Sequence, residues 1–228
     1  MNKITVITGH YGCGKTNFSV NLALRYAKSG EKVTVIDLDI VNPYFRTADF
    51  DKLFEENGIR LVAPEYANSN LDIPSFGFDL MEVSDGHVII DLGGDDAGAV
   101  AVGRFADELI GSGREYDVLY LFNSYRYLTR TAAEAEAVMR EIESASRLKI
   151  TGLVNSSNLG SETTAETVLD SLETADELSA LTSVPIVFTL SSVPLGGEAK
   201  KAVNLFPVDI YVRPPWERDS EGENLSSR

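Results

Sequence analysis

The sequence predicts a three-layer α/β fold built on a doubly wound, mostly parallel sheet. Short apolar segments rich in β-branched residues alternate with helical segments over most of the chain. A glycine-rich turn joins the first predicted strand to the first predicted helix, as in the opening unit of such sheets. Two predicted strands end in aspartate, at the edge where open parallel sheets bind their ligands.

Strands are predicted where short runs of Val, Ile and Leu are bounded by turn residues. These runs cover residues 3–8, 32–37, 59–63, 88–91, 117–122, 149–154, 185–190 and 208–212. Helices are predicted where apolar residues recur at helical spacing, and the first of them stops at Gly30. They cover residues 17–29, 47–57, 97–110, 131–146 and 165–181. No internal repeat or interdomain linker interrupts this alternation.

The chain length of 228 residues fits one α/β domain of ordinary size. We assign residues 1–213 to that single domain and residues 214–228 to a mobile, acidic C-terminal tail. Residues 64–78 form a segment too long and too particular in composition for a bare connector. We expect this segment to line a substrate pocket or to form a surface for a partner.

The composition disfavours several classes of partner. The formal net charge is −15 and the isoelectric point is near 4.5, so the chain repels nucleic acid and anionic lipid. A single cysteine excludes an intrachain disulfide and a cysteine-ligated cluster on one chain. No secretory signal precedes the first strand, and no apolar run approaches the ~20 residues of a membrane helix. We therefore expect a cytoplasmic protein that binds neither nucleic acid nor membrane.

The glycine-rich turn at residues 9–16 matches the phosphate-binding pattern G-x-x-x-x-G-K-[ST]. Its glycines allow the backbone N–H groups to converge on phosphates at the start of a helix, where anions are favoured. The Lys15 ammonium is placed for the β- and γ-phosphates, and the Thr16 hydroxyl for Mg²⁺. This predicts a fold of the P-loop NTPase type and a nucleotide-binding domain. The expected nucleotide contacts are Gly12, Cys13, Gly14, Lys15, Thr16 and Asn17.

The acidic strand ends supply the metal site that such a loop requires. Asp91 follows four apolar residues and is a candidate Walker B carboxylate, holding Mg²⁺ through water. Asp37 and Asp39 alternate along another strand end and so point to opposite faces. Asp95 and Asp96 precede a predicted helix, where capping is the simpler role. The motifs alone predict Thr16 and Asp91 as metal ligands.

With these motifs, the chain resembles the MinD/ParA/CobQ (CobB) group of P-loop NTPases, which carry a deviant Walker A loop. The matching segments are residues 10–16, 37–39 and 91–94, and the resemblance covers roughly residues 1–190. It implies binding of ATP and Mg²⁺, an ATP-dependent homodimer and slow hydrolysis of the β–γ phosphoanhydride. It also implies catalytic roles for Lys15 and for Asp39, which would orient the attacking water, and it adds Asp37 to the expected metal ligands as a second magnesium-shell acid. Asn155 corresponds to an adenine-reading asparagine, with a turn role as the alternative.

One position departs from the family pattern. The family's signature lysine, which reaches the phosphates of the opposite subunit, is replaced here by His10. Histidine could substitute only when protonated, and its ordinary pKa is ~6.5. Arg46, Arg126 and Arg130 are other candidates to reach across, although plain surface roles are open for each.

Cys13 lies inside the phosphate loop, and two interpretations of it stay open. A helix N-terminus lowers the pKa of a thiol and makes it reactive, which would suit redox sensing. The simpler interpretation is that a small side chain fits at this position.

Two main functions are compatible with these motifs. The first is an ATPase switch whose nucleotide state controls an unknown partner protein. The second is an ATP-dependent ligase or transferase of the dethiobiotin-synthetase or CobQ type, acting on a small substrate. A GTPase lacks support because no Asn-Lys-x-Asp tetrad is present, while a nucleotide-binding pseudoenzyme remains open.

Three specialised members of the group are disfavoured. Iron–sulfur carriers need paired cysteines, and DNA-partitioning members need a basic surface. Members that cycle on membranes need a basic amphipathic C-terminal helix, which the acidic tail does not provide.

Overall fold

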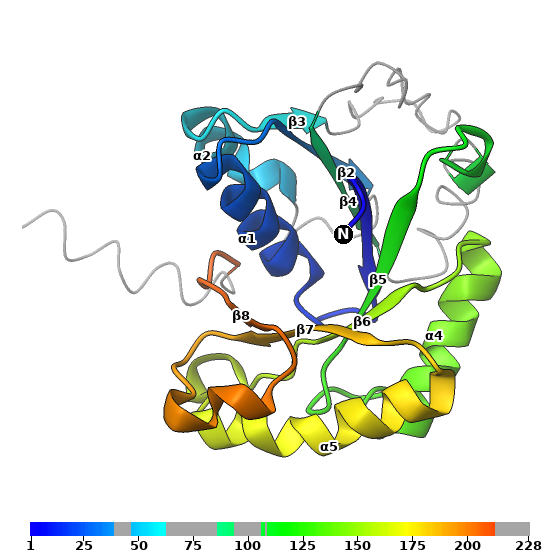
Figure 1. The fold of residues 1–228 in the computed structure, drawn as a ribbon, viewed down its shortest axis with the longest axis vertical. Helices are drawn as coiled ribbons and strands as arrows, with labels where there is room; N and C mark the ends of the chain where they lie inside the picture. The colour runs from blue at the N-terminus through cyan, green and yellow to red at the C-terminus, as the bar shows by residue number, and fades with distance from the viewer. Residues whose placement is uncertain (39–46, 63–85, 94–105, 108, 213–228) are drawn as a thin grey trace, which may run out of the picture.

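The structure, a computed structural model, describes residues 1–38, 47–62, 86–93, 106–107 and 109–212. Within these residues, eight strands form one sheet in the order β3-β2-β4-β1-β5-β6-β7-β8 (Figure 1). Every neighbouring pair is parallel. The strands are β1 (Ile4–Gly9), β2 (Val33–Leu38), β3 (Arg60–Val62), β4 (His87–Leu92), β5 (Tyr116–Phe122), β6 (Gly152–Asn155), β7 (Ile186–Ser191) and β8 (Leu205–Pro207).

Helices cover both faces of the sheet, which gives the three layers that the sequence predicts. In Figure 1, α1 and α2 lie on one side of the sheet and α4 and α5 on the other. The α-helices are α1 (Lys15–Lys28), α2 (Asp51–Glu56), α4 (Ala132–Ser146) and α5 (Ala165–Thr182). Short 3₁₀ turns are η1 (Thr47–Phe50), η3 (Gly160–Glu162) and η4 (Gly196–Lys201). Within the described part of the chain, no helix is both long enough and apolar enough to cross a bilayer.

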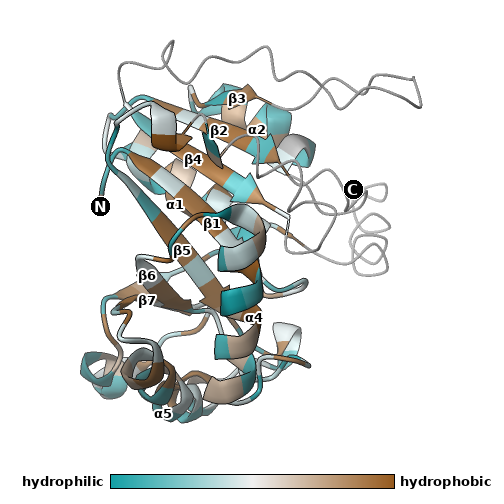
Figure 2. Cartoon of the chain, turned by 90° about the vertical axis from the view of Figure 1, so that its right-hand side faces the viewer, coloured by the Kyte–Doolittle hydropathy of each residue, from teal (hydrophilic) through white to brown (hydrophobic). Residues whose placement is uncertain are grey.

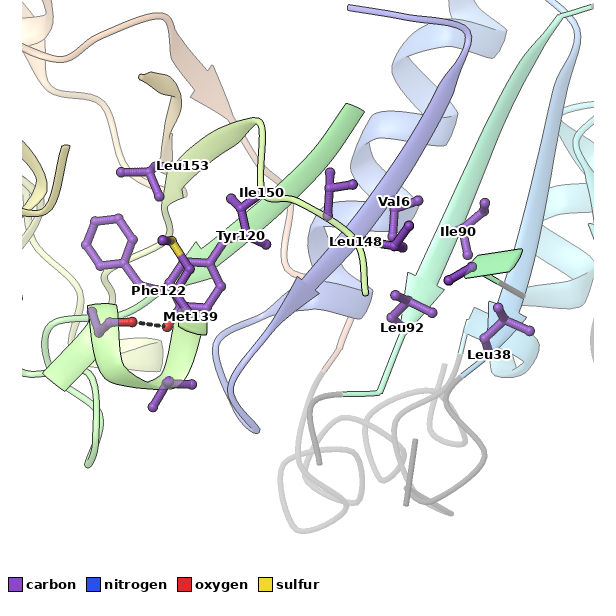
Figure 3. Close-up of a cluster of buried hydrophobic side chains, with 14 of the residues drawn as sticks. Val6, Leu38, Ile90, Leu92, Tyr120, Phe122, Met139, Leu148, Ile150 and Leu153 are labelled. Atoms are coloured by element: carbon purple, nitrogen blue, oxygen red, sulfur yellow. Dashed lines mark hydrogen bonds between the residues drawn. The ribbon is translucent and has the colours of Figure 1, made fainter. Parts of the chain in front are cut away.

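The alternation of side chains along the strands divides the core into two parts. Val6 and Ile90 belong to one part, together with Tyr120 and Phe122 of β5 and Met139 of α4 (Figure 3). The intervening residues face α1. Because both faces are covered, the strands are nearly continuous apolar runs, visible as brown bands in Figure 2.

The two long helices of the second layer begin with capping boxes. At the start of α4, the Thr131 hydroxyl accepts a hydrogen bond from the backbone N–H of Glu134, and the Glu134 carboxylate accepts one from the backbone N–H of Thr131. Thr164 and Thr167 form the same reciprocal pair at the start of α5. These pairs satisfy N–H groups that the first turn of a helix leaves without partners, and so fix where each helix starts.

Most predicted elements are present, and one prediction was wrong. The strand expected at residues 208–212 is absent, and the eighth strand is β8, immediately before it. Two asparagine side chains of α1 form hydrogen bonds with the backbone of residues 209, 211 and 212, whereas the N–H of Val208 donates to the carbonyl of Ser191 in β7 at 3.0 Å. The predicted helix at 97–110 lies mostly outside the described residues, although its end is helical.

The connections diverge on either side of β1, which lies at the centre of the sheet. The chain leaves β1 toward β2 and β3, returns to β4, and then crosses β1 to continue through β5 to β8. The loops that follow β1 therefore lie at the point where the strand order reverses, where open α/β sheets bind ligands.

Candidate functional site

The phosphate loop connects β1 directly to α1, and its glycines are required by geometry. A β-carbon on Gly9 would lie only 2.2 Å from the carbonyl oxygen of Leu121 on β5. Gly14 has φ 86° and directly precedes α1, a left-handed conformation that other residues rarely adopt. The backbone N–H of Cys13 donates to the carbonyl of His10 at 3.2 Å, which closes the loop.

Lys15 and Thr16 are the first two residues of α1, and both are buried. The Lys15 ammonium donates to the carbonyl oxygen of His10 at 3.3 Å, so it lies within the curve of the loop. Residues 15–17 of α1 precede the first intrahelical donor, the N–H of Phe18, which reaches Gly14 at 2.9 Å. Their N–H groups and the positive end of the helix favour an anion at this position.

Asp37 and Asp91 lie side by side on neighbouring strands. They are register partners in the parallel pair of β2 and β4, one position before each strand ends. Register partners point to the same face, and Val35 and Ile89, two positions earlier, belong to the core that α1 covers. Asp37 is 2% exposed and Asp91 is 0% exposed. Two buried carboxylates therefore lie on the α1 side of the sheet, at its ligand-binding edge.

The oxygen atoms of two aspartates and one threonine at this edge fit a magnesium ion that is shared with phosphates. Thr16, Asp37 and Asp91 offer hard oxygen atoms, which Mg²⁺ prefers, and adjacent buried carboxylates are stabilised by a nearby cation. The described residues contain no group of three or more His, Cys, Asp or Glu side chains suited to a metal. A site with two carboxylates and one hydroxyl matches an ion whose remaining ligands are water and nucleotide.

Two loops beside the phosphate loop are joined to it and to each other. Ser156, after β6, donates to the carbonyl oxygen of Cys13. Ser157 accepts a hydrogen bond from the backbone of Ser124, after β5, at 3.0 Å. The Asn123 amide donates to the carbonyl of Asn158 at 3.1 Å. The loops after β1, β5 and β6 therefore form one hydrogen-bonded unit.

Asn155 has the turn role that the sequence left open. Its side chain is 0% exposed, donates to the hydroxyl of Ser171 at 2.8 Å and accepts from the backbone of Ser157 at 3.1 Å. To read a base, the amide would have to leave these partners. Recognition of adenine by Asn155 therefore remains a prediction.

The side chain of Asn17 is hydrogen-bonded to the C-terminal part of the domain. Its amide oxygen accepts from the backbone of Tyr211 at 2.8 Å and of Val212 at 3.2 Å. Its amide nitrogen donates to the carbonyl of Asp209 at 3.0 Å. Any contact of Asn17 with phosphate would use its backbone N–H.

The ionisation of His10 and Cys13 is set by burial and by Lys15. Burial, followed by the charge of Lys15, lowers the pKa of His10 from its ordinary 6.5, so the ring is neutral at pH 7. Cys13 is 0% exposed, and burial raises the pKa of its thiol despite the nearby Lys15. The lowered thiol pKa considered from the sequence is therefore wrong, and packing explains Cys13 better than redox sensing.

Several sequence candidates lie outside the described residues. These are Asp39, Arg46, Asp95, Asp96, residues 64–78 and the tail 214–228. Arg126 and Arg130 are described, and both are exposed on the loop after β5.

The comparisons with known proteins agree with this geometry. A profile of the ParA family, described as the NUBPL iron-transfer P-loop NTPase, matches residues 1–91. Over these residues the sequence is similar to this family of P-loop NTPases. The match contains the phosphate loop and both buried aspartates. No curated protein matches the chain.

Solved structures of FtsY share the fold. Cell division protein FtsY from Thermotoga maritima has a TM-score of 0.57 at 18% identity, covering 82% of this chain and 60% of its own. FtsY from Mycoplasma mycoides has a TM-score of 0.55 at 18% identity, with 82% and 58% covered. The FtsY of Elizabethkingia anophelis, solved with GDP, has a TM-score of 0.52 at 16% identity, with 83% and 57% covered. The chain thus spans about 60% of the length of these structures.

Sequence reasoning missed the residues whose hydrogen bonds join the neighbouring loops to one another and to the phosphate loop. Ser156 and Asn123 carried no motif, although both follow predicted strands at the ligand-binding edge. Their position just after the carboxyl ends of two predicted strands is the signal that could have found them.

Proposed function

We propose that this P-loop NTPase binds ATP with Mg²⁺ and acts as a nucleotide-dependent switch on a partner protein. The observation that carries the proposal is the register of Asp37 with Asp91, two buried carboxylates on the α1 side of the sheet, together with the phosphate loop that leads into α1. One end of this site suits a polyphosphate and the other suits the metal that accompanies it.

Each residue has a distinct part in this proposal. Lys15 and the N–H groups of the loop neutralise the β- and γ-phosphates. Thr16 and Asp37 hold the magnesium ion, and Asp91 holds it through water. Asp39, which follows Asp37 beyond the end of β2, orients the water that attacks the γ-phosphate. The resulting hydrolysis is slow and resets the switch.

Adenine is the base that we favour. Guanine presents N–H donors that are typically bound by a carboxylate, and residues 155–158, in the loop after β6, offer amides and hydroxyls but no carboxylate. The GDP in one FtsY structure is no guide here, because the identity to that protein is only 16%.

Iron transfer, which the matching profile names, is not extended to this chain. Its only cysteine is Cys13, which is buried in the phosphate loop. An exposed pair of soft thiolate ligands is therefore not available on one chain. The expected partner is a protein, and the expected active form is a homodimer.

Light scattering tests the switch. The mass of the wild type and of Asp39→Ala would be measured with ATP·Mg²⁺, with ADP·Mg²⁺ and without nucleotide. We expect a doubled mass only with ATP·Mg²⁺, and a longer-lived dimer for the variant, because hydrolysis is blocked. A mass that does not respond to ATP would contradict the switch, and metabolites would then be screened for stimulated ATP turnover.

A further inference from the structure

The phosphate loop is in contact with a cation from outside the motif. A β-carbon built on Gly12 would lie 3.7 Å from the Cζ atom and 3.8 Å from the Nε atom of Arg126. The Arg126 guanidinium therefore lies against the middle of the loop, although the two residues are separated by most of the first half of the chain. The same charge acts on the thiol of Cys13, the next residue in the loop.

The backbone of Arg126 is held in place by a tight turn. Its N–H donates to the carbonyl of Asn123 at 3.0 Å, and its own carbonyl accepts from the backbone of Thr129 at 3.2 Å. The buried Thr129 hydroxyl also donates to the Asn123 carbonyl, at 2.7 Å. Tyr125 anchors the turn to α5 through a hydrogen bond from its hydroxyl to the carbonyl of Thr167 at 2.9 Å. The guanidinium is thus presented from a rigid base.

The charge of Arg126 is not committed to another group in the described part of the chain. None of the ion pairs or side-chain hydrogen bonds there includes its guanidinium. An exposed arginine without a carboxylate, placed against a phosphate loop, has the charge and the forked donors that bind phosphate oxygens.

His10, at the other end of the loop, does not supply a second positive charge there. His10 is neutral at pH 7, because burial and Lys15 lower the pKa of its ring. In the described part of the loop and its neighbours, Lys15 and Arg126 are then the two positive charges at this site.

We propose that Arg126 is a phosphate-binding residue, whose guanidinium contacts the β- and γ-phosphates of the nucleotide bound in its own subunit. This inference rests on the proposed function, since it concerns the same nucleotide. It differs from an arginine that reaches across a dimer interface, because Gly12 and Arg126 belong to one chain.

Binding measurements on monomeric protein test this assignment. Titration calorimetry would compare the wild type with Arg126→Ala, Arg126→Lys and Arg130→Ala at concentrations where light scattering shows a monomer. The ligands are ATP·Mg²⁺ and inorganic tripolyphosphate, which has no base or ribose. Arg130→Ala is the matched control, since Arg130 is exposed on the same loop. Circular dichroism would confirm that each variant is folded.

We expect Arg126→Ala to weaken the binding of both ligands about tenfold, the effect of losing one charge-assisted hydrogen bond. Arg126→Lys should recover part of this loss, and Arg130→Ala should stay within about twofold of the wild type. Four results would overturn the assignment. They are wild-type affinity in Arg126→Ala, a loss confined to ATP, an equal loss in Arg130→Ala, and a loss seen only in dimeric protein. In each of these cases, binding of ATP·Mg²⁺ by the wild type would leave the proposed function intact. A wild type that binds neither ligand would overturn both.

Discussion

Asn21→Ala tests how the C-terminal part of the domain is attached beside the phosphate loop. The Asn21 side chain is 8% exposed on α1. Its amide oxygen accepts from the backbone of Asp209 at 2.8 Å, and its amide nitrogen donates to the carbonyl of Asp209 at 2.9 Å. These contacts, with those of Asn17, hold residues 209–212 beside α1.

The loss of stability expected for Asn21→Ala can be worked out from these contacts. The variant loses two hydrogen bonds to Asp209, each contributing about 1 kcal/mol. Asp209 is exposed, so water can replace its lost partners, and alanine raises helix propensity by about 0.6 kcal/mol. The free energy of unfolding should therefore fall by about 1.4 kcal/mol.

Equilibrium unfolding in urea measures this change. Lys28→Ala, at an exposed position of the same helix, controls for helix propensity and should change stability by less than about 0.5 kcal/mol. Chymotrypsin should also cleave Asn21→Ala faster after Tyr211, since the segment is held less firmly. A loss of stability no larger than that of Lys28→Ala would refute the reasoning.

Three further predictions concern the loop and the fold. Gly9→Ala should destabilise the protein by more than about 3 kcal/mol in urea, because its β-carbon would meet the Leu121 carbonyl at 2.2 Å. Gly30→Ala, with φ 81° but open space around it, should cost only about 1–2 kcal/mol; equal losses would contradict the clash. Burial of Glu143 opposes its ionisation, but hydrogen bonds from the backbone N–H of residue 150 and from two basic side chains outweigh this and lower its pKa from 4.5. Because the folded protein stabilises the ionised carboxylate, Glu143→Gln should lower the free energy of unfolding by about 1 kcal/mol at pH 7, and this difference should vanish as the pH falls through the lowered pKa; a constant difference would be evidence against it. Burial raises the pKa of Cys13, so iodoacetamide should label the native thiol at least about tenfold more slowly than the urea-unfolded one; equal rates would disprove its protection.

The phosphate loop and its flanking elements were predictable because local sequence encodes them. The glycines, Lys15 and Thr16 lie within a motif of eight consecutive residues, so they can be recognised from sequence alone. The apolar runs on either side of the motif identify β1 and α1. The same is true of the acidic strand ends, since an aspartate after a buried run is visible without knowledge of the fold.

The relation between distant residues was not predictable. Asp37 and Asp91 meet because β2 and β4 pair, and no local pattern sets that register. The contact of Arg126 with Gly12 likewise depends on the placement of β5 beside β1. The expected strand at 208–212 failed for a related reason. Its alternating apolar residues suit a strand, but the side chains of Asn17 and Asn21 satisfy its backbone.

Calorimetric titration of ATP, in Mg²⁺ and in EDTA, tests the central claim that this site binds ATP·Mg²⁺. The wild type would be compared with Lys15→Ala, which removes the ammonium from the loop, and with Asp91→Asn, which removes one carboxylate charge. The account predicts magnesium-dependent binding by the wild type, at least about tenfold weaker in Lys15→Ala, and little response to Mg²⁺ in Asp91→Asn. Absence of binding by the wild type, or equal affinity in Lys15→Ala, would contradict it.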